Sequence, residues 1–365
     1  MPSTGRTGGI GFSIGNKGYV GLGTNGSTFF DLWEWDQTSN SWTQKALFPG
    51  PSRITPACFV IGTKGYVSTG DDGAGGYFQD LWEWDQSSNV WTQKSNFSGS
   101  ARSGAVGFSI GTKGYISTGG VTGSFTDDLW EWDQGTDSWT QRANLSDTTR
   151  TYAFGAAIGG KAYVIYGLNG FYLFENNVWE WNQGTDTWTQ KADFPSTSRE
   201  LASGFVIGDT IYVGTGIKMG PMFQDFWQWD PLSNNWIQKV NFAGGARYGS
   251  VGFSIGNKGY LATGTDNTSF FNDLWEYTPG PTGIHNKESD KNNLSIYPNP
   301  VLNVSVVEWK SENKNEALVQ IYDANGNLVK NFTSLNKFIL NKNDFNSGIY
   351  IIQIDNSIRS KFIVQ

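Results

Sequence analysis

The sequence contains very few of the residues on which most enzymes and metal sites depend, with one cysteine (Cys58) and one histidine (His285) among 365 residues. A single cysteine excludes a disulfide bond within the chain, and the two residues together cannot form a Cys/His metal cluster. His285 lies in a polar segment and Cys58 in a predicted inner strand, so neither is expected to serve in Ser-His-Asp or Cys-His catalysis. We therefore predict no catalytic residue, no metal and no cofactor.

Charge and long apolar runs are also scarce. Charged residues make up 16% of the chain and the net charge is −7, which argues against a nucleic acid partner because phosphate binding requires a basic surface. No apolar run approaches the roughly 18 residues of a membrane span. The first residues, MPSTGRTGG, show neither the basic nor the apolar region of a secretory signal peptide.

Glycine and aromatic residues, in contrast, are abundant, with 47 Gly and 17 Trp. This mixture is typical of many short strands joined by tight turns. One phrase, DLWEWDQTSNSWTQK at residue 31, returns in related forms at residues 80, 128, 177 and 225. A shortened copy, DLWEYTPGPTG, starts at residue 273. Such a repeat indicates a fold built from equivalent units.

Each copy carries one arginine, and successive arginines are 47 to 49 residues apart. Each arginine lies 13 residues before a tyrosine (Tyr19, Tyr66, Tyr115, Tyr163, Tyr212 and Tyr260), and the first and last Trp of a complete copy are 9 residues apart. Only the interval from the tyrosine to the first Trp varies, from 14 to 16 residues, so all variation in length lies in one loop. The arginines are Arg6, Arg53, Arg102, Arg150, Arg199 and Arg247.

Each copy reads as four strands, which we name A to D. In the first copy they lie in GGIGFSI (8–14), YVGLG (19–23), DLWEWD (31–36) and SWTQK (41–45). Four-stranded units that repeat every 40–50 residues or so are typical of a β-propeller. We therefore predict an all-β fold with a six-bladed propeller over residues 1–279.

Three features of the repeat resemble the kelch repeat: strand B ends in glycine, an aromatic–Asp pair closes strand C, and a Trp opens strand D. The resemblance covers residues 1–279, although the doubled glycine typical of kelch is complete only at Gly119–Gly120. It implies a kelch-type propeller. It says little about function, because kelch propellers serve many roles.

The sixth copy supplies strands A to C and stops at Tyr277, before its strand D. We expect a strand from upstream of Met1 to complete this blade, as in the strand exchange that closes kelch rings. The chain would then be part of a longer precursor that carries a signal peptide. The alternatives are further blades upstream, or a three-stranded last blade whose exposed strand C would be an aggregation liability.

The composition changes after Pro279. Residues 280–293 are polar and charged, which predicts a linker. Residues 294–365 alternate apolar and polar side chains in about seven short strands, and Asn325–Gly326 is a strong hairpin signal. We predict a small Ig-like β-sandwich for this second domain.

Four pieces of this second domain, in this order, resemble the type A sorting domain of the type IX secretion system of Bacteroidota. They are YPNP (297–300), IYDANGNLVK (321–330), SGIYIIQI (347–354) and the terminal KFIVQ. The resemblance implies export by that machinery, with residues 294–365 as its recognition domain, followed by removal of this domain. A secreted or outer-membrane surface protein is therefore expected. The alternative is a generic sandwich that binds sugar or stiffens the protein.

Because the strands alternate in direction, the D–A and B–C loops should open at the same end of the ring. The arginines stand in the D–A loops, and the variable B–C loops are rich in aromatic residues, as binding loops on a rigid scaffold often are. In kelch propellers that resemble this one, the arginine-bearing end takes acidic peptides. We therefore predict ligand contacts from the six arginines and from Phe29, Tyr77, Phe125, Phe171, Tyr172 and Phe270. The alternative is that each arginine ties loops together through carbonyls or through the Asp before the strand C Trp.

Carboxylates recur as well, at Glu34, Glu83, Glu131, Glu180 and Glu276, with Gln228 in the fifth copy. A Glu in strand C faces a Lys or Arg in strand D, as Glu34 faces Lys45, which predicts a cross-strand ion pair and not a catalytic site. The segment GDDGAGG (70–76) could hold Ca²⁺ through Asp71 and Asp72, but it lacks the ordered alternation of an EF-hand loop. We predict a solvated loop there.

These features predict a monomeric binding or adhesion module for a glycan, a peptide or another surface protein, and not an enzyme. A carboxylate-based glycosidase or lyase is the second hypothesis, and a passive structural array is the third. An enzyme should show an unrepeated acid or tyrosine cluster in the mouth of the central channel. A binder should show only repeat-equivalent residues and loop aromatics there.

Overall fold

The computed structural model describes residues 1–279 except residue 147, and residues 294–297, 301, 303–309, 316–323, 327–355 and 358–364. The chain divides into two compact units, Met1–Tyr277 and Thr278–Gln365. The predicted linker, residues 280–293 with His285, lies outside the described residues. All described elements are strands apart from one short 3₁₀ helix, so the all-β prediction is confirmed.

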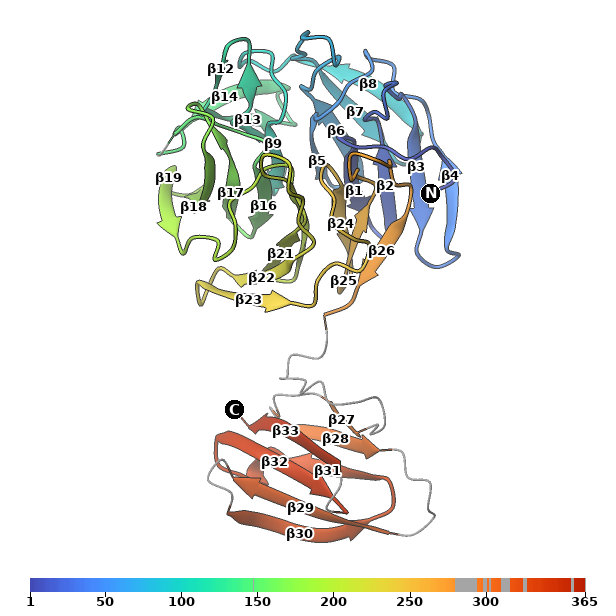
Figure 1. Cartoon of the computed structure of the whole chain (residues 1–365), viewed down its shortest axis with the longest axis vertical. Coiled ribbons are helices and arrows are strands. Elements are labelled where there is room, and N and C mark those ends of the chain that lie inside the picture. The colour runs from blue at the N-terminus through green and yellow to red at the C-terminus, as the bar shows by residue number, and fades with distance from the viewer. Residues whose placement is uncertain are drawn as a thin grey trace. The chain divides into compact units, whose positions relative to one another are not determined.

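In the first unit, the described residues form six successive antiparallel sheets, which we call blades 1 to 6 (Figure 1). Blade 1 contains β1 (Ile10–Ile14), β2 (Lys17–Gly21), β3 (Leu32–Asp36) and β4 (Ser41–Gln44). Blade 2 contains β5 (Ala57–Ile61), β6 (Lys64–Ser68), β7 (Leu81–Asp85) and β8 (Val90–Lys94). Blade 3 contains β9 (Val106–Ile110), β10 (Lys113–Ser117), β13 (Leu129–Asp133) and β14 (Ser138–Arg142), with a hairpin of β11 (Gly120–Val121) and β12 (Ser124–Phe125) in its B–C loop.

Blades 4 to 6 repeat this pattern, except that two strands are longer in blade 4 and that blade 6 has three strands among the described residues. Blade 4 contains β15 (Arg150–Thr151), β16 (Phe154–Ile158), β17 (Lys161–Asn169), β18 (Phe174–Asn182) and β19 (Thr187–Lys191), so its B and C strands are longer. Blade 5 contains β20 (Ser203–Ile207), β21 (Thr210–Gly214), β22 (Phe226–Asp230) and β23 (Asn235–Lys239). Blade 6 contains β24 (Val251–Ile255), β25 (Lys258–Ala262) and β26 (Leu274–Tyr277).

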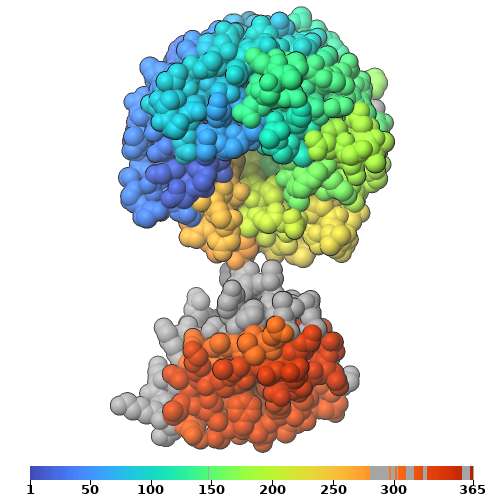
Figure 2. Space-filling model, turned by 180° about the vertical axis from the view of Figure 1, so that it is seen from behind, coloured from blue at the N-terminus to red at the C-terminus, as the bar shows by residue number. Residues whose placement is uncertain are grey.

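A closed circle of backbone hydrogen bonds joins the inner strands. In each blade, the residue two positions after the repeated arginine donates its amide hydrogen to the carbonyl of the equivalent residue in the preceding blade, at 2.7–3.1 Å. All six residues have φ between 49° and 62°, a left-handed conformation that glycine adopts without strain. All six residues line one pocket of about 130 Å³. The space-filling view shows a hollow in the first unit (Figure 2). The members of the circle are Gly8, Thr55, Gly104, Tyr152, Leu201 and Gly249.

Indole rings fill the space between neighbouring blades. Trp132 in strand C of blade 3 is fully buried, and its ring centroid lies 5.0 Å from that of Tyr66 in blade 2. Trp35 of blade 1 makes the same contact with Tyr260 of blade 6, also at 5.0 Å. The last interface of the ring therefore has the same Trp–Tyr contact. Between blades 5 and 6, Tyr277 takes the place of the indole, and its ring centroid lies 5.1 Å from that of Tyr212.

A polar network at each blade accompanies these rings. The hydroxyl of Tyr66 donates to Glu83 at 2.7 Å, and Gln134 of the next blade donates to the same hydroxyl at 2.7 Å. Lys94 of strand D lies 3.7 Å from Glu83. The predicted ion pair between strands C and D is confirmed, with equivalents at 2.8–3.7 Å in blades 1, 3 and 4. The recurring Glu thus has a structural role.

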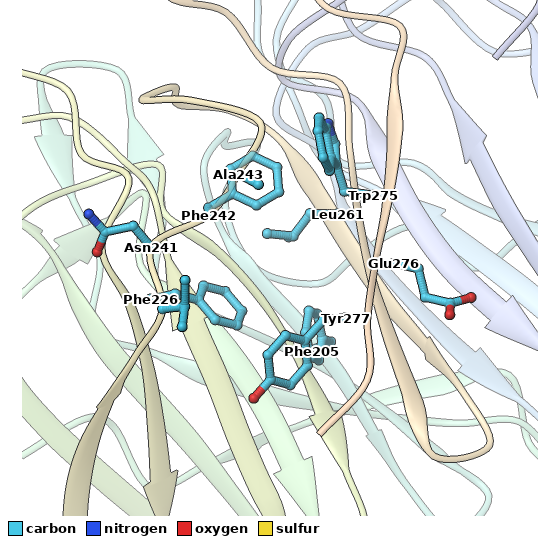
Figure 3. A pocket seen from close by; sticks show the side chains of 10 residues that line it. Phe205, Phe226, Asn241, Phe242, Ala243, Leu261, Trp275, Glu276 and Tyr277 are labelled. Atoms are coloured by element: carbon cyan, nitrogen blue, oxygen red, sulfur yellow. The ribbon is translucent and has the colours of Figure 1, made fainter. Parts of the chain in front are cut away.

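Blade 6 has three strands in the described part of the chain, so β26 pairs with β25 on one side only. The expected fourth strand is not among the described residues. A pocket of about 200 Å³ lies beside β26, where the side chains of Phe242, Leu261, Trp275 and Tyr277 converge (Figure 3).

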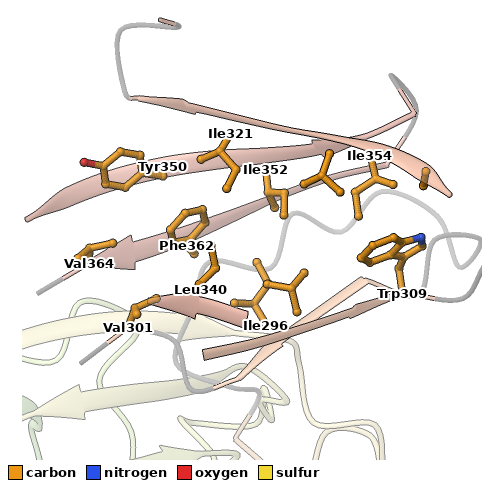
Figure 4. Close-up of a cluster of buried hydrophobic side chains, with 13 residues drawn as sticks. Ile296, Val301, Trp309, Ile321, Leu340, Tyr350, Ile352, Ile354, Phe362 and Val364 are labelled. Carbon is orange, nitrogen blue, oxygen red and sulfur yellow. The ribbon is translucent and has the colours of Figure 1, made fainter. Parts of the chain in front are cut away.

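The second unit contains seven strands in two sheets within the described residues, in agreement with the predicted sandwich. One sheet contains β27 (Leu294–Tyr297), β28 (Val304–Trp309) and β31 (Lys337–Asn341); the other contains β29 (Ala317–Asp323), β30 (Leu328–Ser334), β32 (Gly348–Ile354) and β33 (Ile358–Val364). The 3₁₀ helix, η1 (Lys342–Asp344), follows β31. β29 and β30 pair as a hairpin, although residues 324–326 of the predicted turn lie outside the described residues. Apolar side chains of both sheets form the core, among them Val307, Trp309, Ile321, Ile352 and Phe362 (Figure 4).

We expect Trp132→Ala to lower the free energy of unfolding by about 3–5 kcal/mol, because it leaves a cavity between blades 2 and 3. Urea unfolding followed by circular dichroism measures the change. Leu232→Ala, at a side chain that is 96% exposed, is the control and should change stability little. Equal effects of the two substitutions would contradict the role assigned to the inter-blade indoles.

Candidate ligand-binding face

The D–A and B–C loops lie at the same end of the propeller, as predicted. In blade after blade, the residue that follows the repeated arginine forms a β-bridge with a residue of the B–C loop. Examples are Thr7 with Thr24, Glu200 with Ile217 and Tyr248 with Thr265. We call this end of the propeller, with both sets of loops, the loop face.

The six arginines do not contact solvent at this face, which corrects the prediction that they bind a ligand. Arg6, Arg53, Arg102, Arg150, Arg199 and Arg247 are each at most 1% exposed. In blade 2, Arg53 forms an ion pair with Asp80 at 2.6 Å and donates to the carbonyl of Thr69 at 2.9 Å. Blades 1, 3, 5 and 6 repeat both contacts, and in blade 4 Asn177 takes the place of the Asp.

The alternative role, in which each arginine ties loops together, is therefore the one that the structure shows. Burial alone would raise the pKa of the Asp80 carboxyl, but the hydrogen bonds and charge of Arg53 outweigh it and hold this pKa below its usual value. The indole of Trp82 also donates to Asp80, at 2.7 Å. Each arginine thus joins the end of strand B to the start of strand C.

Phe29 is half-buried and its ring covers an arginine, so its contact with a ligand stays a prediction. The guanidinium of Arg6 lies 4.4 Å from the ring centroid of Phe29. Phe78, Phe223 and Phe271 hold the same relation to the arginines of blades 2, 5 and 6, at 3.9–4.6 Å. We call each arginine, with its Asp or Asn and its carbonyl partner, an arginine clamp. These phenylalanines add a cation–π contact to the clamp.

Other predicted aromatic residues do reach the surface of the loop face. Phe171 and Tyr172, at the tip of the β17–β18 hairpin, are 77% and 70% exposed, and Phe270 of blade 6 is 43% exposed. Tyr77 and Phe125 are half-buried, and the ring of Phe125 contacts that of Tyr172 at 5.5 Å. These five residues remain candidates for ligand contact. Leu173 and Met219, at 60% and 85% exposure, extend the apolar surface.

The centre of the loop face, which we call the channel mouth, has further residues that occur in one blade only. A pocket of about 130 Å³ lies there, and Thr55, Tyr152 and Leu201 are among its lining residues. Tyr152 occupies a position held by glycine in blades 1, 3 and 6. Glu200 occupies the position after the arginine, where the other blades have Thr, Ile, Ser, Thr and Tyr. Sequence reasoning missed both because it searched for recurring residues, whereas the signal is a departure from the repeat.

The electrostatics of these residues differ from those of the repeated carboxylates. Burial raises the pKa of Glu200 to about 7, and its Oε2 atom is buried without a hydrogen-bond partner. Burial also raises the pKa of Tyr152, and the nearby charges of Asp71 and Glu200 raise it further, whereas a hydrogen bond with Ser103 lowers it. Tyr152 lines the pocket at the channel mouth, and the carboxyl of Glu200, although it does not line that pocket, lies close enough to raise the pKa of this tyrosine.

The remaining candidates from the sequence have local partners. Asp72 accepts hydrogen bonds from the amides of Ala74 and Gly76, and Asp71 accepts one from Gly73, so both carboxylates shape their own loop. Within the described residues, no group of three or more His, Cys, Asp or Glu side chains is arranged to hold a metal ion. Burial raises the pKa of the Cys58 thiol to about 11, as expected for an inert inner-strand residue.

Comparison with known proteins agrees with this architecture. Residues 295–365 match the secretion system C-terminal sorting domain, and residues 149–195 match the Kelch motif. Among solved structures, the chain is similar to YjhT, with a TM-score of 0.68 and 18% identity over 77% of this chain and 98% of that chain. No curated protein sequence matches the chain.

The first unit therefore has the fold of a β-propeller with a Kelch motif at residues 149–195, and residues 295–365 are a secretion system C-terminal sorting domain, in agreement with the resemblances in the sequence. The sorting domain points to an exported protein, secreted or at the cell surface, and to the secretion machinery as a partner of this domain. Among the described residues, no helix is long and apolar enough to cross a lipid bilayer.

We expect Arg102→Met to lower the free energy of unfolding by about 3–5 kcal/mol, because Asp128 would keep a buried charge without its partner. Denaturant unfolding measures the loss. Lys330→Met is the matched control, since Lys330 and Asp344 form a partly exposed ion pair at 2.7 Å, and such pairs contribute about 0–1 kcal/mol. If Arg102→Met lowered the free energy of unfolding no more than Lys330→Met does, the buried arginines would not stabilise the loops.

The raised pKa of Glu200 predicts a pH dependence of stability. The folded state binds the proton of this carboxyl more tightly than the unfolded state, so its contribution to stability should fall as the pH rises from about 4.5 to about 7. Glu200→Gln should therefore stabilise the protein more at pH 8 than at pH 5, which thermal unfolding at the two values measures. Asp209→Asn, at an exposed turn, is the control. A difference between variant and wild type that does not change with pH would contradict the assignment.

Proposed function

We propose that the propeller is a binding module whose ligand is a carbohydrate held at the loop face. The observation that carries this proposal is the pair of exposed rings of Phe171 and Tyr172, of which the ring of Tyr172 packs edge-on against Phe125. Large exposed apolar groups gathered in one place are typical of interaction sites. An aromatic ring offers a flat face with a negative quadrupole, which suits the C–H groups of a sugar ring.

The burial of the arginines supports a carbohydrate ligand over an acidic peptide. An acidic peptide would need cationic groups at the loop face, but the six repeated guanidinium groups are already paired below the surface. A neutral ligand that combines an apolar face with hydroxyl groups does not need cationic groups on the protein. The channel mouth supplies polar partners beside the aromatic rim, among them Thr55 and Tyr152. Apolar walls with a few polar groups are the usual composition of a ligand site.

A glycoside hydrolase or lyase is the second candidate, and one observation favours it. Glu200 and Tyr152 are unrepeated residues at the channel mouth, which is the feature expected of an enzyme. A carboxyl with a pKa of about 7 is suited to general acid–base chemistry at neutral pH. The exposed aromatic residues would then hold the polysaccharide beside this pair.

Screening the full chain on glycan and peptide arrays tests the binding proposal. We expect saturable glycan binding that weakens at least about tenfold in the double variant Phe171→Ala/Tyr172→Ala, because hot-spot aromatics carry most of the binding free energy. The control is Leu232→Ala, which removes an equally exposed apolar side chain from the turn between β22 and β23.

The possible outcomes separate the candidates. Binding to peptides alone would contradict a carbohydrate ligand, and an unchanged affinity in the double variant would contradict the site. Incubation of the bound glycans with the full chain reveals any cleavage. Cleavage that disappears in Glu200→Gln, while binding persists, would show that the propeller is an enzyme.

A further inference from the structure

Polar side chains from blades 2, 4 and 5 gather at the channel mouth. Asp71 lies in the B–C loop of blade 2, whereas Tyr152 and Glu200 follow the repeated arginines of blades 4 and 5. The hydroxyl of Thr55 donates to the Asp71 carboxylate at 3.3 Å, and both Thr55 and Tyr152 line the pocket of about 130 Å³. The positions equivalent to Asp71 hold Thr, Gly, Leu, Ile and Thr, so this carboxylate is also a departure from the repeat.

A glycine of blade 3 allows the ring of Tyr152 to lie across its neighbour blade. A Cβ atom at Gly104 would lie 2.6 Å from Cδ1 of Tyr152, so the ring covers this glycine directly. The phenol also has a hydrogen bond with Ser103 of blade 3. Asp71 and Glu200 both lie close enough for their charges to raise the pKa of Tyr152. The phenol is therefore within the field of a carboxylate from blade 2 and of another from blade 5.

The carboxyl of Glu200 has no cation to pair with. Its Oε2 atom is buried without a hydrogen-bond partner, and burial is what raises its pKa to about 7. Arg199, the preceding residue, is bound by Asp225, and the amino group of Lys218 donates to Ser198 at 2.9 Å. A buried carboxylate without a donor is costly, so a ligand that supplies a donor or a positive charge gains binding free energy there.

The loops around the channel mouth contain more carboxylates than cations. Outside the arginine clamps, the B–C loops have a single lysine, Lys218, against five acidic residues. A surface with this balance attracts positively charged ligands and repels a polymer of uronic acids. The five acidic residues are Asp71, Asp72, Asp127, Glu175 and Asp266.

Aromatic rings beside carboxylates are suited to an ammonium group. The face of a tyrosine ring attracts a cation through its quadrupole, and a carboxylate accepts charge-assisted hydrogen bonds from it. Tyr77, which forms a β-bridge with Asp71, adds a second half-buried ring close enough to act on the pKa of Tyr152. A sugar hydroxyl would leave the charges of Asp71 and Glu200 unbalanced, whereas a protonated amine balances them.

We propose that the carbohydrate bound at the loop face is an amino sugar with a free amine, whose ammonium group binds at the channel mouth beside Tyr152, Asp71 and Glu200. This inference rests on the proposed carbohydrate-binding function and names the class of sugar. The exposed rings of Phe171 and Tyr172 contact the faces of the sugar, and the channel mouth selects its charge. N-acetylation removes that charge, so the acetylated form of the same sugar lacks the selected group.

Two matched oligosaccharides test this selection. The full chain is titrated with a glucosamine hexamer, which carries free amines, and with the fully N-acetylated hexamer, in isothermal titration calorimetry at pH 7. We expect the glucosamine hexamer to bind at least about tenfold more tightly at low salt, because only its amines pair with the carboxylates. The difference between the two affinities should shrink as the salt concentration rises.

Variants without these charges locate the ammonium group. The double variant Asp71→Asn/Glu200→Gln should reduce the preference for the glucosamine hexamer to about threefold or less, because both carboxylates are neutralised without a change of size. Asp127→Asn is the matched control and should keep the preference. It removes a carboxylate from the same face, where Asp127 is held by Asn144 at 3.2 Å.

Proton release separates charge pairing from a purely structural effect of Glu200. An ammonium group beside this carboxyl favours its ionised form, so binding at pH 7 should release about half a proton more from the wild type than from Glu200→Gln. Calorimetry in two buffers with different enthalpies of ionisation measures this difference. Proton exchange by the amines of the ligand is common to both proteins and cancels.

The outcomes distinguish this inference from the function on which it rests. Equal affinity for the two hexamers would overturn the amino-sugar inference and leave the carbohydrate-binding proposal intact. A preference that persists in the double variant would overturn the site. Binding of a lysine-rich peptide but of no glycan would contradict the carbohydrate-binding proposal, and the inference with it.

Discussion

Burial of both faces of every blade is the constraint on which the structure depends. A single four-stranded sheet of this sequence would expose large aromatic side chains on both sides, and only a neighbour on each side removes them from water. A circle provides two neighbours for every sheet. The contact between Trp35 and Tyr260 repeats at the last interface the geometry of the others, and the backbone bonds from Gly8 to Gly249 close the inner ring.

The same arrangement determines which residues are available to a ligand. Each arginine at the loop face is used internally, where Asp80 and the carbonyl of Thr69 neutralise and orient Arg53. Burying an ion pair is costly unless its donors find acceptors, and Arg53 meets that condition because its Nε also donates to the carbonyl of Pro51 at 3.1 Å. The Nε atoms of Arg6 and Arg247, in contrast, are buried without a hydrogen-bond partner. The repeated residues hold the loops in place. The recognition surface that we propose consists of residues that differ between blades, such as Tyr152 and Phe171.

Much of the propeller could be predicted from the sequence, because fixed distances between Arg, Tyr and Trp determine strand lengths and pairing. The environment of Arg6 could not be predicted, since an arginine near a loop can be either an exposed cation at the surface or a buried residue that holds the loop in place. Only the folded chain brings Asp31, 25 residues away, within 2.5 Å of it. Glu200 was missed for a different reason: its significance lies in being unlike its five equivalents, and its raised pKa comes from burial that no sequence pattern records.

The clamps also bear on how such a protein could diversify. Arg199 holds the carbonyl of Thr215 at 2.9 Å and the carboxylate of Asp225 at 2.5 Å, and thereby fixes both ends of the intervening loop in a frame that the neighbouring blades share. A loop exchanged between these two anchor points would start and finish in the same positions whatever its contents. The ring can therefore acquire new specificities by insertion or grafting at single blades, while the rest of the molecule remains unaltered.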